Sequence, residues 1–364
     1  MKVLFLTTHL NTGGITSYLY TLAKGLIQRG HSVHIGSSAG NMQAAFEKIG
    51  AKIIILNIRT KSEMSPKIYF SLGALKSYIK ANSIDIIHAH TRVTQVMGHF
   101  STQALGIPLV TTCHGFFKPR LFRKIFPCWG ERVIAISAAV QKHLQEDFHV
   151  PQEKIAQVSN GIDLKSFPLI DEKQRQAGKQ KFGLSTEPTV GIIARLSQVK
   201  GQDVLIAAMR EVIKKIPQAQ LFIIGEGKTE ESLKKLTKDY QLEKSVHFLS
   251  MLNQTRDGLM LLDVFAMPSR QEGLGISVIE AQSCGLAVVA SKVGGLPSLI
   301  EDGKTGFLVE VENPTQLAQR IIWLLENQQL RQKIGLAARE FVVKNYSSDQ
   351  MVTQTLDVYQ KVLR

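Results

Sequence analysis

Short apolar runs alternate with amphipathic stretches along most of the chain. The runs have the length of strands, and the stretches between them, such as 15–29 and 93–105, repeat apolar residues at helical spacing. This alternation predicts parallel sheets, because consecutive parallel strands are joined by crossover helices. The strands predicted in the first half lie near residues 2–7, 32–37, 52–56, 84–88, 108–112, 132–136 and 155–158.

The alternation resumes in the second half. Strands are predicted near residues 189–194, 220–224, 246–249, 264–267 and 287–290, and helices at 314–326 and 330–343. Between the halves, a polar, charge-rich stretch from residue 171 to 187 predicts the domain boundary. A chain of 364 residues also exceeds the roughly 250–300 residues that a single core usually serves. We therefore expect an α/β protein with two facing Rossmann-like domains, parallel sheets and a cleft between the domains.

Composition and charge narrow the class of protein. Most of the formal net charge of +14 lies in residues 1–185, whereas residues 186–364 are nearly balanced. The chain has no recognisable nucleic-acid-binding motif to accompany this basic half, so we expect no nucleic-acid partner. Its three cysteines form no C-x-x-C pair or disulfide framework, and its first apolar run is too short for a signal peptide. These features favour a cytoplasmic protein.

Two cations follow the first strand predicted in the second half. Arg195 stands where the apolar run 189–194 ends, and Lys200 lies five residues later, before an amphipathic stretch. Open α/β sheets bind ligands at the carboxyl ends of their strands. Both side chains can therefore converge on one anion, and a diphosphate is the expected ligand.

The segment 268–281 carries two carboxylates beside a glycine-rich turn. Glu272 precedes the turn 273–276, and Glu280 lies in the helix predicted after it. The glycines let backbone N–H groups approach a ligand, and the start of the helix adds partial positive charge. Each carboxylate can accept hydrogen bonds from a hydroxyl pair, one on a sugar and the other on a ribose. Together with the two cations, this pattern suits a sugar carried on a nucleoside diphosphate.

The motifs resemble those of retaining GT-B glycosyltransferases, in particular glycosyltransferase family 4 (glycosyltransferase group 1). The E-x7-E pattern of Glu272 and Glu280 is preceded by Pro-Ser and followed by Ala-Gln-Ser-Cys-Gly, as in that family. Further matching segments are Gly13-Gly14 and residues 85–90, 111–115, 159–163, 225–227, 294–298 and 302–308.

This resemblance implies a GT-B fold with an acceptor domain of residues 1–168 and 347–364 and a donor domain of residues 169–346. The last helix would cross back to the first domain. The implied reaction moves a hexose or N-acetylhexosamine from a nucleoside-diphosphate sugar to a glycan or lipid-linked acceptor, in the synthesis of cell-envelope polysaccharide or lipopolysaccharide. UDP-sugars are favoured as donors, with GDP-mannose as the other option. The expected donor-binding residues are Gly13, Gly14, Arg195, Lys200, Gly225, Leu249, Glu272, Gly273, Leu274, Gly275, Ile276 and Glu280.

The resemblance also assigns roles to two histidines. His114 matches the family histidine beside the donor sugar, and His90 the one that lines the cleft on the acceptor side. Either could instead be a buried structural imidazole, and the residues alone leave this alternative open. The expected catalytic residues are His114, Arg195, Lys200 and Glu272.

Neither a metal nor another cofactor is expected. The sequence contains no D-x-D motif, the aspartate pair that holds a divalent cation in metal-dependent transferases. Arg195, Lys200 and the start of the helix after Gly275 can stabilise a leaving diphosphate instead. The family retains the anomeric configuration, which implies attack on the face that the diphosphate leaves.

The segment 116–129 interleaves basic residues with aromatic and aliphatic ones. Basic side chains attract anionic headgroups, while aromatic and aliphatic side chains enter the interface. Lys118, Arg120, Arg123 and Lys124 are therefore expected to contact an anionic membrane surface or a lipid acceptor, which would make the protein peripheral on the inner face of the cytoplasmic membrane. A helix packed on its own domain would show the same pattern, and both explanations remain open.

Two other classes of function stay open. One is a nucleotide-sugar epimerase of the same architecture, and the other is a non-catalytic protein that binds sugar nucleotides or lipids. A dinucleotide-binding dehydrogenase is disfavoured because Gly13 and Gly14 lack the G-x-G-x-x-G spacing, and a P-loop NTPase because no G-x-x-x-x-G-K-[ST] segment occurs.

Overall fold

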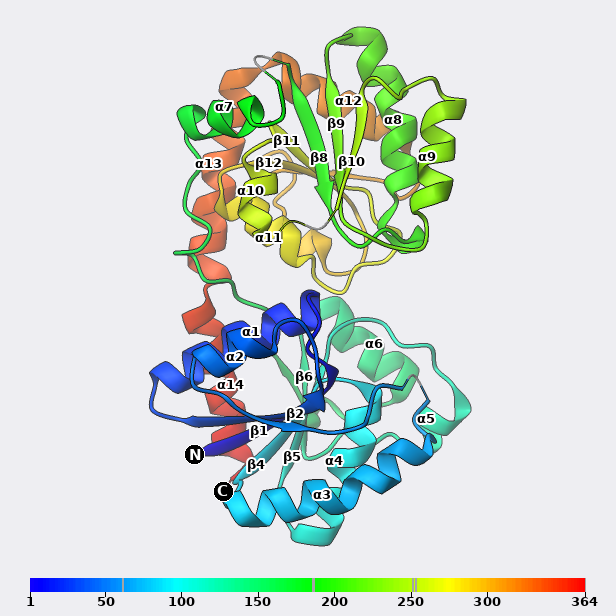
Figure 1. Ribbon diagram of the computed structural model, residues 1–364. Helices are drawn as coiled ribbons and strands as arrows, with labels where there is room; N and C mark the ends of the chain where they lie inside the picture. The colour runs from blue at the N-terminus through cyan, green and yellow to red at the C-terminus, as the bar shows by residue number, and fades with distance from the viewer. Residues whose placement is uncertain (61, 185–186, 251, 253, 364) are drawn as a thin grey trace. The chain divides into compact units, whose positions relative to one another are not determined.

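The computed structural model describes residues 1–60, 62–184, 187–250, 252 and 254–363. The chain forms two compact units (Figure 1). Unit 1 comprises Met1–Ile162 and Ser348–Arg364, and unit 2 comprises Asp163–Ser347. Each unit contains a parallel sheet with helices packed against it, so the predicted fold class of two Rossmann-like α/β domains is confirmed.

Unit 1 is built on a seven-stranded parallel sheet, counted within the described residues, in the order β3-β2-β1-β4-β5-β6-β7. β1 is an inner strand and pairs with β2 and β4, so that Phe5 stands opposite Ile35 and His88. The strands are β1 (Lys2–His9), β2 (Ser32–Ser38), β3 (Lys52–Ile55), β4 (Ile86–Ala89), β5 (Leu109–Cys113), β6 (Arg132–Ala135) and β7 (Ile155–Gln157).

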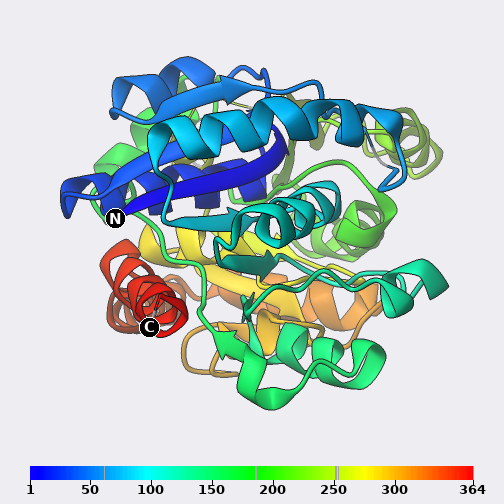
Figure 2. The same cartoon turned by 90° about the horizontal axis from the view of Figure 1, so that it is seen from below.

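Helices cover both faces of this sheet, which explains why its central strands are continuous apolar runs. Val3 and Phe5 pack in one core with α1 and α14, whereas Leu4 and Leu6 point to the other face, toward α3 and α4. Figure 2, seen from below, shows α3 and α4 in front of the strands. The helices are α1 (Gly14–Gln28), α2 (Gln43–Lys48), α3 (Pro66–Asn82), α4 (Arg92–Leu105), α5 (Leu121–Ile125), α6 (Ala138–Phe148), the 3-10 helix η1 (Gln152–Lys154) and α14 (Ser348–Val362).

Unit 2 is built on a six-stranded parallel sheet, counted in the same way, in the order β10-β9-β8-β11-β12-β13. The strands are β8 (Thr189–Ile193), β9 (Gln220–Ile224), β10 (Val246–Leu249), β11 (Val264–Met267), β12 (Ala287–Ser291) and β13 (Phe307–Val309). The helices are α7 (Glu172–Gln180), η2 (Gln198–Lys200), α8 (Gln202–Lys215), α9 (Glu230–Asp239), α10 (Thr255–Leu259), α11 (Ile276–Ser283), η3 (Leu296–Ser298), α12 (Pro314–Glu326) and α13 (Gln328–Asn345).

The charge-rich stretch 171–187 lies inside unit 2 and does not separate the units. Its residues 185–186 are outside the described part of the chain, and most of the rest forms α7. The Asp171 side chain accepts a hydrogen bond from the backbone N–H of Gln174 at 2.8 Å and starts the helix as a capping box. Near its end, Lys179 forms a buried ion pair with Asp263 at 2.6 Å. The polar residues here therefore belong to a helix that is capped at its start and held to unit 2 by an ion pair, and not to a linker between domains.

Candidate functional site

Lys200 and Glu272 meet at the carboxyl ends of the unit 2 strands. Lys200 ends η2, which follows β8, and Glu272 follows β11, the neighbour of β8 in the sheet. The Lys200 ammonium lies 2.5 Å from the Glu272 carboxylate, and both side chains are partly buried. The hydroxyl of Ser269 lies 3.5 Å from the same carboxylate oxygen. The structure thus pairs one of the two predicted cations with one of the two predicted carboxylates.

Two glycines allow the loops around this pair to approach closely. Gly201 has φ of 68°, and a Cβ atom there would lie 1.9 Å from the carbonyl oxygen of Pro268. Gly294 has φ of 56°, and a Cβ atom there would lie 1.9 Å from the carbonyl oxygen of Glu272. Both positions combine a left-handed backbone with backbone contact, so a side chain would push the loops apart.

Arg270 connects the same loops by hydrogen bonds, and its role was not predicted from the sequence. Its guanidinium makes two hydrogen bonds to Asp203 at 2.9 and 2.7 Å, one to Glu312 at 2.8 Å and one to the carbonyl of Gln198 at 2.7 Å. The hydrogen bond with Asp203 raises the pKa of Arg270 above its usual value. Its position two residues before Glu272 was the only available signal.

The loops that follow β8, β9 and β10 are joined by hydrogen bonds and lie next to the loops of Lys200 and Glu272. Arg195 is exposed, while its backbone carbonyl accepts a hydrogen bond from Gln202 at 3.1 Å. The N–H of Leu196 donates to Glu226, and the N–H of Gly225 donates to the carbonyl of Leu249 at 2.9 Å in each case. The predicted donor residues Arg195, Gly225 and Leu249 therefore lie on three adjoining strand ends.

α11 lies at the end to which the strands of this sheet point (Figure 1). Gly275 is its N-cap, with φ of 103° and no side-chain cap, so the first N–H groups of the helix are available to an anion. The preceding turn contains Gly273 and the buried Leu274, and Ile276 is the first residue of the helix. Burial raises the pKa of Glu280, within α11, to about 8. This carboxyl can therefore be protonated at neutral pH.

In unit 1, His90 and His114 follow the neighbouring strands β4 and β5. Nδ1 of His90 lies 3.2 Å from Nε2 of His114, and the Tyr18 ring packs 4.8 Å from the His114 ring, measured between centroids. His90 is buried behind His114, whereas His114 is partly exposed. Burial lowers the pKa of His114 to about 3 and that of His90 well below its usual value. Both imidazoles are therefore neutral, and one donates a hydrogen bond to the other.

His88 lies beneath this pair and links it to the last helix. Its Nδ1 is 2.6 Å from the hydroxyl of Tyr359 in α14, and its Nε2 is 2.7 Å from the hydroxyl of Thr112. The His88 and His90 rings lie 4.1 Å apart, measured between centroids. Burial holds the pKa of His88 well below its usual value. Among the described residues, no group of three or more His, Cys, Asp or Glu side chains could hold a metal ion.

Gly13 and Gly14 open α1 at an exposed loop. Gly14 is the first residue of α1 and Gly13 is its N-cap, with an extended backbone. The loop is fixed from both sides, because the N–H of Thr12 donates to Asn41 at 2.9 Å and the hydroxyl of Thr16 donates to the carbonyl of Asn11 at 2.7 Å. The two glycines therefore present a second helix start, in unit 1.

Two family models match the chain. The model described as Glycosyltransferase Family 4 matches residues 12–166, and the model described as Glycosyl transferases group 1 matches residues 174–341. Together the two matches span most of the chain. This protein belongs to the family 4 glycosyltransferases.

Individual relatives and one solved structure agree with the family. The glycosyltransferase is 26% identical over 374 residues to N-acetyl-alpha-D-glucosaminyl L-malate synthase of Bacillus anthracis, covering 99% of this chain and 97% of the relative. It is 35% identical over 211 residues, 55% of each chain, to a GDP-mannose-dependent monoacylated alpha-(1-6)-phosphatidylinositol monomannoside mannosyltransferase of Corynebacterium glutamicum. HepE of Anabaena, solved in complex with UDP-glucose, superposes with a TM-score of 0.88 at 24% identity, over 99% of this chain and 100% of that chain. This likeness shows the GT-B fold.

The basic segment of the glycosyltransferase is only partly at the surface. Lys118, Arg120 and Lys124 are exposed. Arg123 differs, because its guanidinium lies 4.2 Å from the centre of the Phe117 ring and burial lowers its pKa to about 10. Arg123 is therefore less exposed than the other three cations, and the contact of the four with a membrane stays a prediction. Within the described residues, no helix is long and apolar enough to span a membrane.

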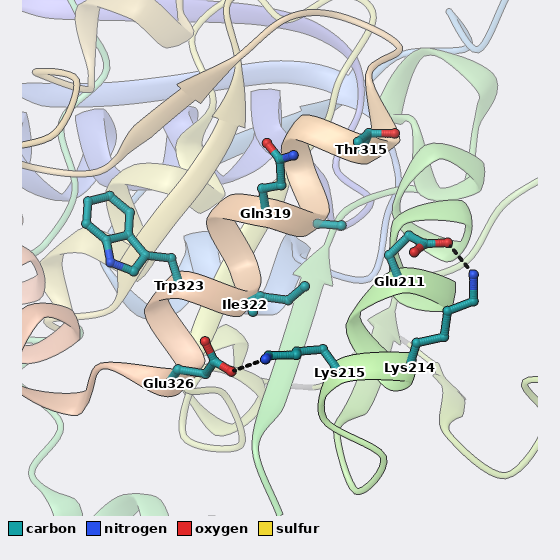
Figure 3. A pocket seen from close by; sticks show the side chains of 9 residues that line it. Glu211, Lys214, Lys215, Thr315, Gln319, Ile322, Trp323 and Glu326 are labelled. Carbon is teal, nitrogen blue, oxygen red and sulfur yellow. Dashed lines mark hydrogen bonds and ion pairs between the residues drawn. The ribbon is translucent and has the colours of Figure 1, made fainter.

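A surface hollow of about 530 Å³ lies between α8 and α12 of the glycosyltransferase (Figure 3). Its two lysines are paired, Lys214 with Glu211 at 2.8 Å and Lys215 with Glu326 at 3.8 Å. Trp323 lies at its margin (Figure 3). None of the predicted donor residues lines this hollow.

Proposed function

We propose that this glycosyltransferase transfers a hexose or N-acetylhexosamine from a nucleoside-diphosphate sugar, with UDP-sugars favoured, to a lipid-linked or glycan acceptor. The contact between Lys200 and Glu272 carries the proposal. An enzyme of this kind must place a cation where the diphosphate leaves and a hydroxyl acceptor where the sugar lies, and these two groups adjoin here.

The pair also explains how the charges of the site are balanced when no substrate is bound. In the free protein, Lys200 and Glu272 neutralise each other. An arriving diphosphate competes for the Lys200 ammonium, and the Glu272 carboxylate is then free to accept hydrogen bonds from the sugar hydroxyls. Because charge on the diphosphate grows as its bond to the sugar breaks, Lys200, Arg195 and the start of α11 bind the transition state more strongly than the donor.

The proposed reaction retains the anomeric configuration. The bond between the anomeric carbon and the diphosphate oxygen breaks, and positive charge develops on the sugar ring. The acceptor hydroxyl attacks on the face that the diphosphate leaves, and the leaving phosphate oxygen takes the hydroxyl proton. Cationic side chains supply the charge for this step, so we propose that the reaction proceeds without a metal. The contact of His114 with the donor sugar stays a prediction.

The acceptor class is the second part of the proposal. One relative is named for a phosphatidylinositol mannoside acceptor and another for L-malate, so the family accepts both lipids and small acids. Exposed Lys118, Arg120 and Lys124 favour an acceptor in an anionic membrane surface. We therefore propose a lipid-linked acceptor in the synthesis of cell-envelope glycans.

A panel of donors tests the first part. Thermal unfolding is measured with UDP-, GDP- and ADP-sugars, and the sugars of one of these nucleotides should stabilise the protein. A ligand at 100 times its dissociation constant adds about 2.7 kcal/mol to the free energy of unfolding. Release of the nucleoside diphosphate from the stabilising donor should persist in EDTA. Loss of turnover in EDTA with recovery in Mn²⁺ would refute the metal-free mechanism. Conversion of the donor into an isomeric nucleotide sugar would identify an epimerase instead.

A further inference from the structure

Large apolar side chains are exposed around the start of α3, outside the basic segment. The exposed fractions are 64% for Met64, 48% for Tyr69 and 86% for Phe70. Ile68 and Leu75 of the same helix are buried and hold it against the sheet. Single exposed apolar residues are ordinary, but a group of this size around the start of one helix indicates a binding surface.

This group is continuous with the exposed part of the basic segment. A chain of ring contacts joins Tyr69 to Phe100 at 5.9 Å, Phe100 to Phe126 at 5.8 Å and Phe126 to Phe122 at 5.8 Å, measured between centroids. Beyond Phe122, α5 exposes 73% of Leu121 and 72% of Ile125. The residues Met64, Tyr69, Phe70, Leu121, Phe122 and Ile125 are called the apolar surface below.

Arg92 fixes the two parts of the apolar surface together. Its guanidinium forms an ion pair with Glu63, before α3, and donates hydrogen bonds to the carbonyls of Phe126 and Pro127, after α5. These contacts join the segment before α3 to the residues that follow α5. The apolar surface is therefore a fixed arrangement of two segments.

The charges beside the apolar surface are almost entirely positive. Lys67, Lys118, Arg120 and Lys124 are exposed. The only carboxylate in residues 62–70 and 116–126 is that of Glu63, which Arg92 neutralises. Apolar side chains within a positive rim match a bilayer that contains anionic lipid, because headgroups attract the cations while the apolar groups enter the interface.

We propose that the apolar surface is a membrane-contact surface built from both α3 and α5, with Phe70 as its principal inserting side chain. The inference rests on the proposed membrane acceptor and extends it, because it assigns membrane contact to a helix outside the basic segment. Phe70 presents the largest exposed apolar fraction of the group, so it gains most from entering the interface.

Co-sedimentation with vesicles tests the surface. Wild type is compared with Phe70→Ser, with a Lys118→Ser, Arg120→Ser and Lys124→Ser triple variant, and with Leu336→Ser as the control. Leu336 is 50% exposed on a helix of unit 2, so the control removes a similar apolar group elsewhere. The vesicles contain phosphatidylglycerol and phosphatidylcholine, or phosphatidylcholine alone. Circular dichroism confirms that each variant is folded.

We expect wild type to bind the anionic vesicles and Phe70→Ser to bind them about tenfold more weakly. The triple variant should also bind more weakly, and its binding should be less sensitive to salt. Leu336→Ser should bind like wild type. Wild-type binding by Phe70→Ser, with loss in the triple variant, would overturn the role of α3 while the proposed membrane acceptor stands. No binding by wild type would overturn both, while transfer from a nucleotide sugar would still stand on donor release. Self-association that Phe70→Ser abolishes, without vesicle binding, would assign the surface to a second copy and overturn the proposal.

A fluorescence measurement gives an independent readout. Phe70→Trp is made in a Trp323→Phe background, because Trp323 is the more exposed of the two native tryptophans. Its emission should shift to shorter wavelength with anionic vesicles and be quenched by brominated lipid. Unchanged emission under conditions where the protein sediments with the vesicles would show that residue 70 stays in water, and would overturn the insertion of α3.

Discussion

Lys200 serves two partners in turn, Glu272 in the free protein and the diphosphate in the proposed reaction. We expect Lys200→Ala to lower kcat/KM about 100-fold to 1000-fold, because it removes a charge that acts mainly in the transition state. Initial rates of nucleoside-diphosphate release measure this. Lys214→Ala is the matched control, since Lys214 pairs with Glu211 on the surface of the same unit. Equal rates for the two variants would contradict the assignment of Lys200.

Glu280, one of the residues predicted to bind the donor, makes the stability of unit 2 depend on pH. Burial raises its pKa to about 8, above the ordinary value of 4.5. Between these pH values the folded protein holds a proton that the unfolded chain releases, so stability falls as pH rises. We expect the stability gained by Glu280→Gln, relative to wild type, to grow from about pH 5 to about pH 8. Urea unfolding measures this, with the exposed Glu340→Gln as control. A gain that does not change with pH would contradict the burial of this carboxyl.

The sequence indicated candidate residues for the chemistry, but it said less about the contacts that hold them. Arg195, Lys200 and Glu272 were predicted because strand ends and glycine-rich turns are local patterns. Arg270 was missed because its role depends on Asp203 and Glu312, which only the fold brings to it. The stacking of Arg123 on Phe117 was not predicted for a similar reason, since it depends on a turn that composition does not reveal.

At the scale of elements, the loop between β12 and η3 holds Glu272 in place. We expect Gly294→Ala to destabilise unit 2 by more than the roughly 1–2 kcal/mol that a left-handed alanine costs, because its Cβ would also meet the Glu272 carbonyl. Gly303→Ala separates the two effects, since Gly303 has φ of 76° with no atom within 4 Å of the added Cβ. Thermal unfolding and donor binding of both variants measure the difference. Equal losses of stability in the two variants would mean that the loop moves away from the added Cβ without an energetic penalty.

The elements themselves were largely predictable, because buried parallel strands are apolar on both faces and stand out from their surroundings. The three-residue β13 was not predicted, although the equally short β7 was expected near residues 155–158. α7 was taken for a boundary because its surface is charged and its single buried ion pair joins residues far apart in the sequence. The joining of α3 to α5 could not be foreseen, since it depends on ring contacts between three segments.

At the scale of the whole molecule, the separate cores should respond differently to acid. Burial lowers the pKa of His88, His90 and His114 in unit 1 below the ordinary 6.5. Below that pH the unfolded chain takes up protons that the folded unit excludes, so stability falls by up to about 1.4 kcal/mol per pH unit for each histidine. We expect calorimetry to show one unfolding transition that moves steeply between about pH 6.5 and pH 5. The other transition, assigned to unit 2 by its shift in Glu280→Gln, should move less. Parallel movement of both would contradict the neutral histidines.

The path of the chain through unit 1 has a consequence for its synthesis. Residues 1–162 leave the ribosome first, yet their core lacks the part that α14 supplies, including Met351, Val352 and Tyr359. Unit 2 is complete in one uninterrupted stretch, Asp163–Ser347, and can fold before that helix has been made. The nascent first domain therefore waits, with part of one face of its sheet uncovered, until unit 2 and α14 have been made. Chains that stop short of α14 would expose this face and become substrates for chaperones and proteases.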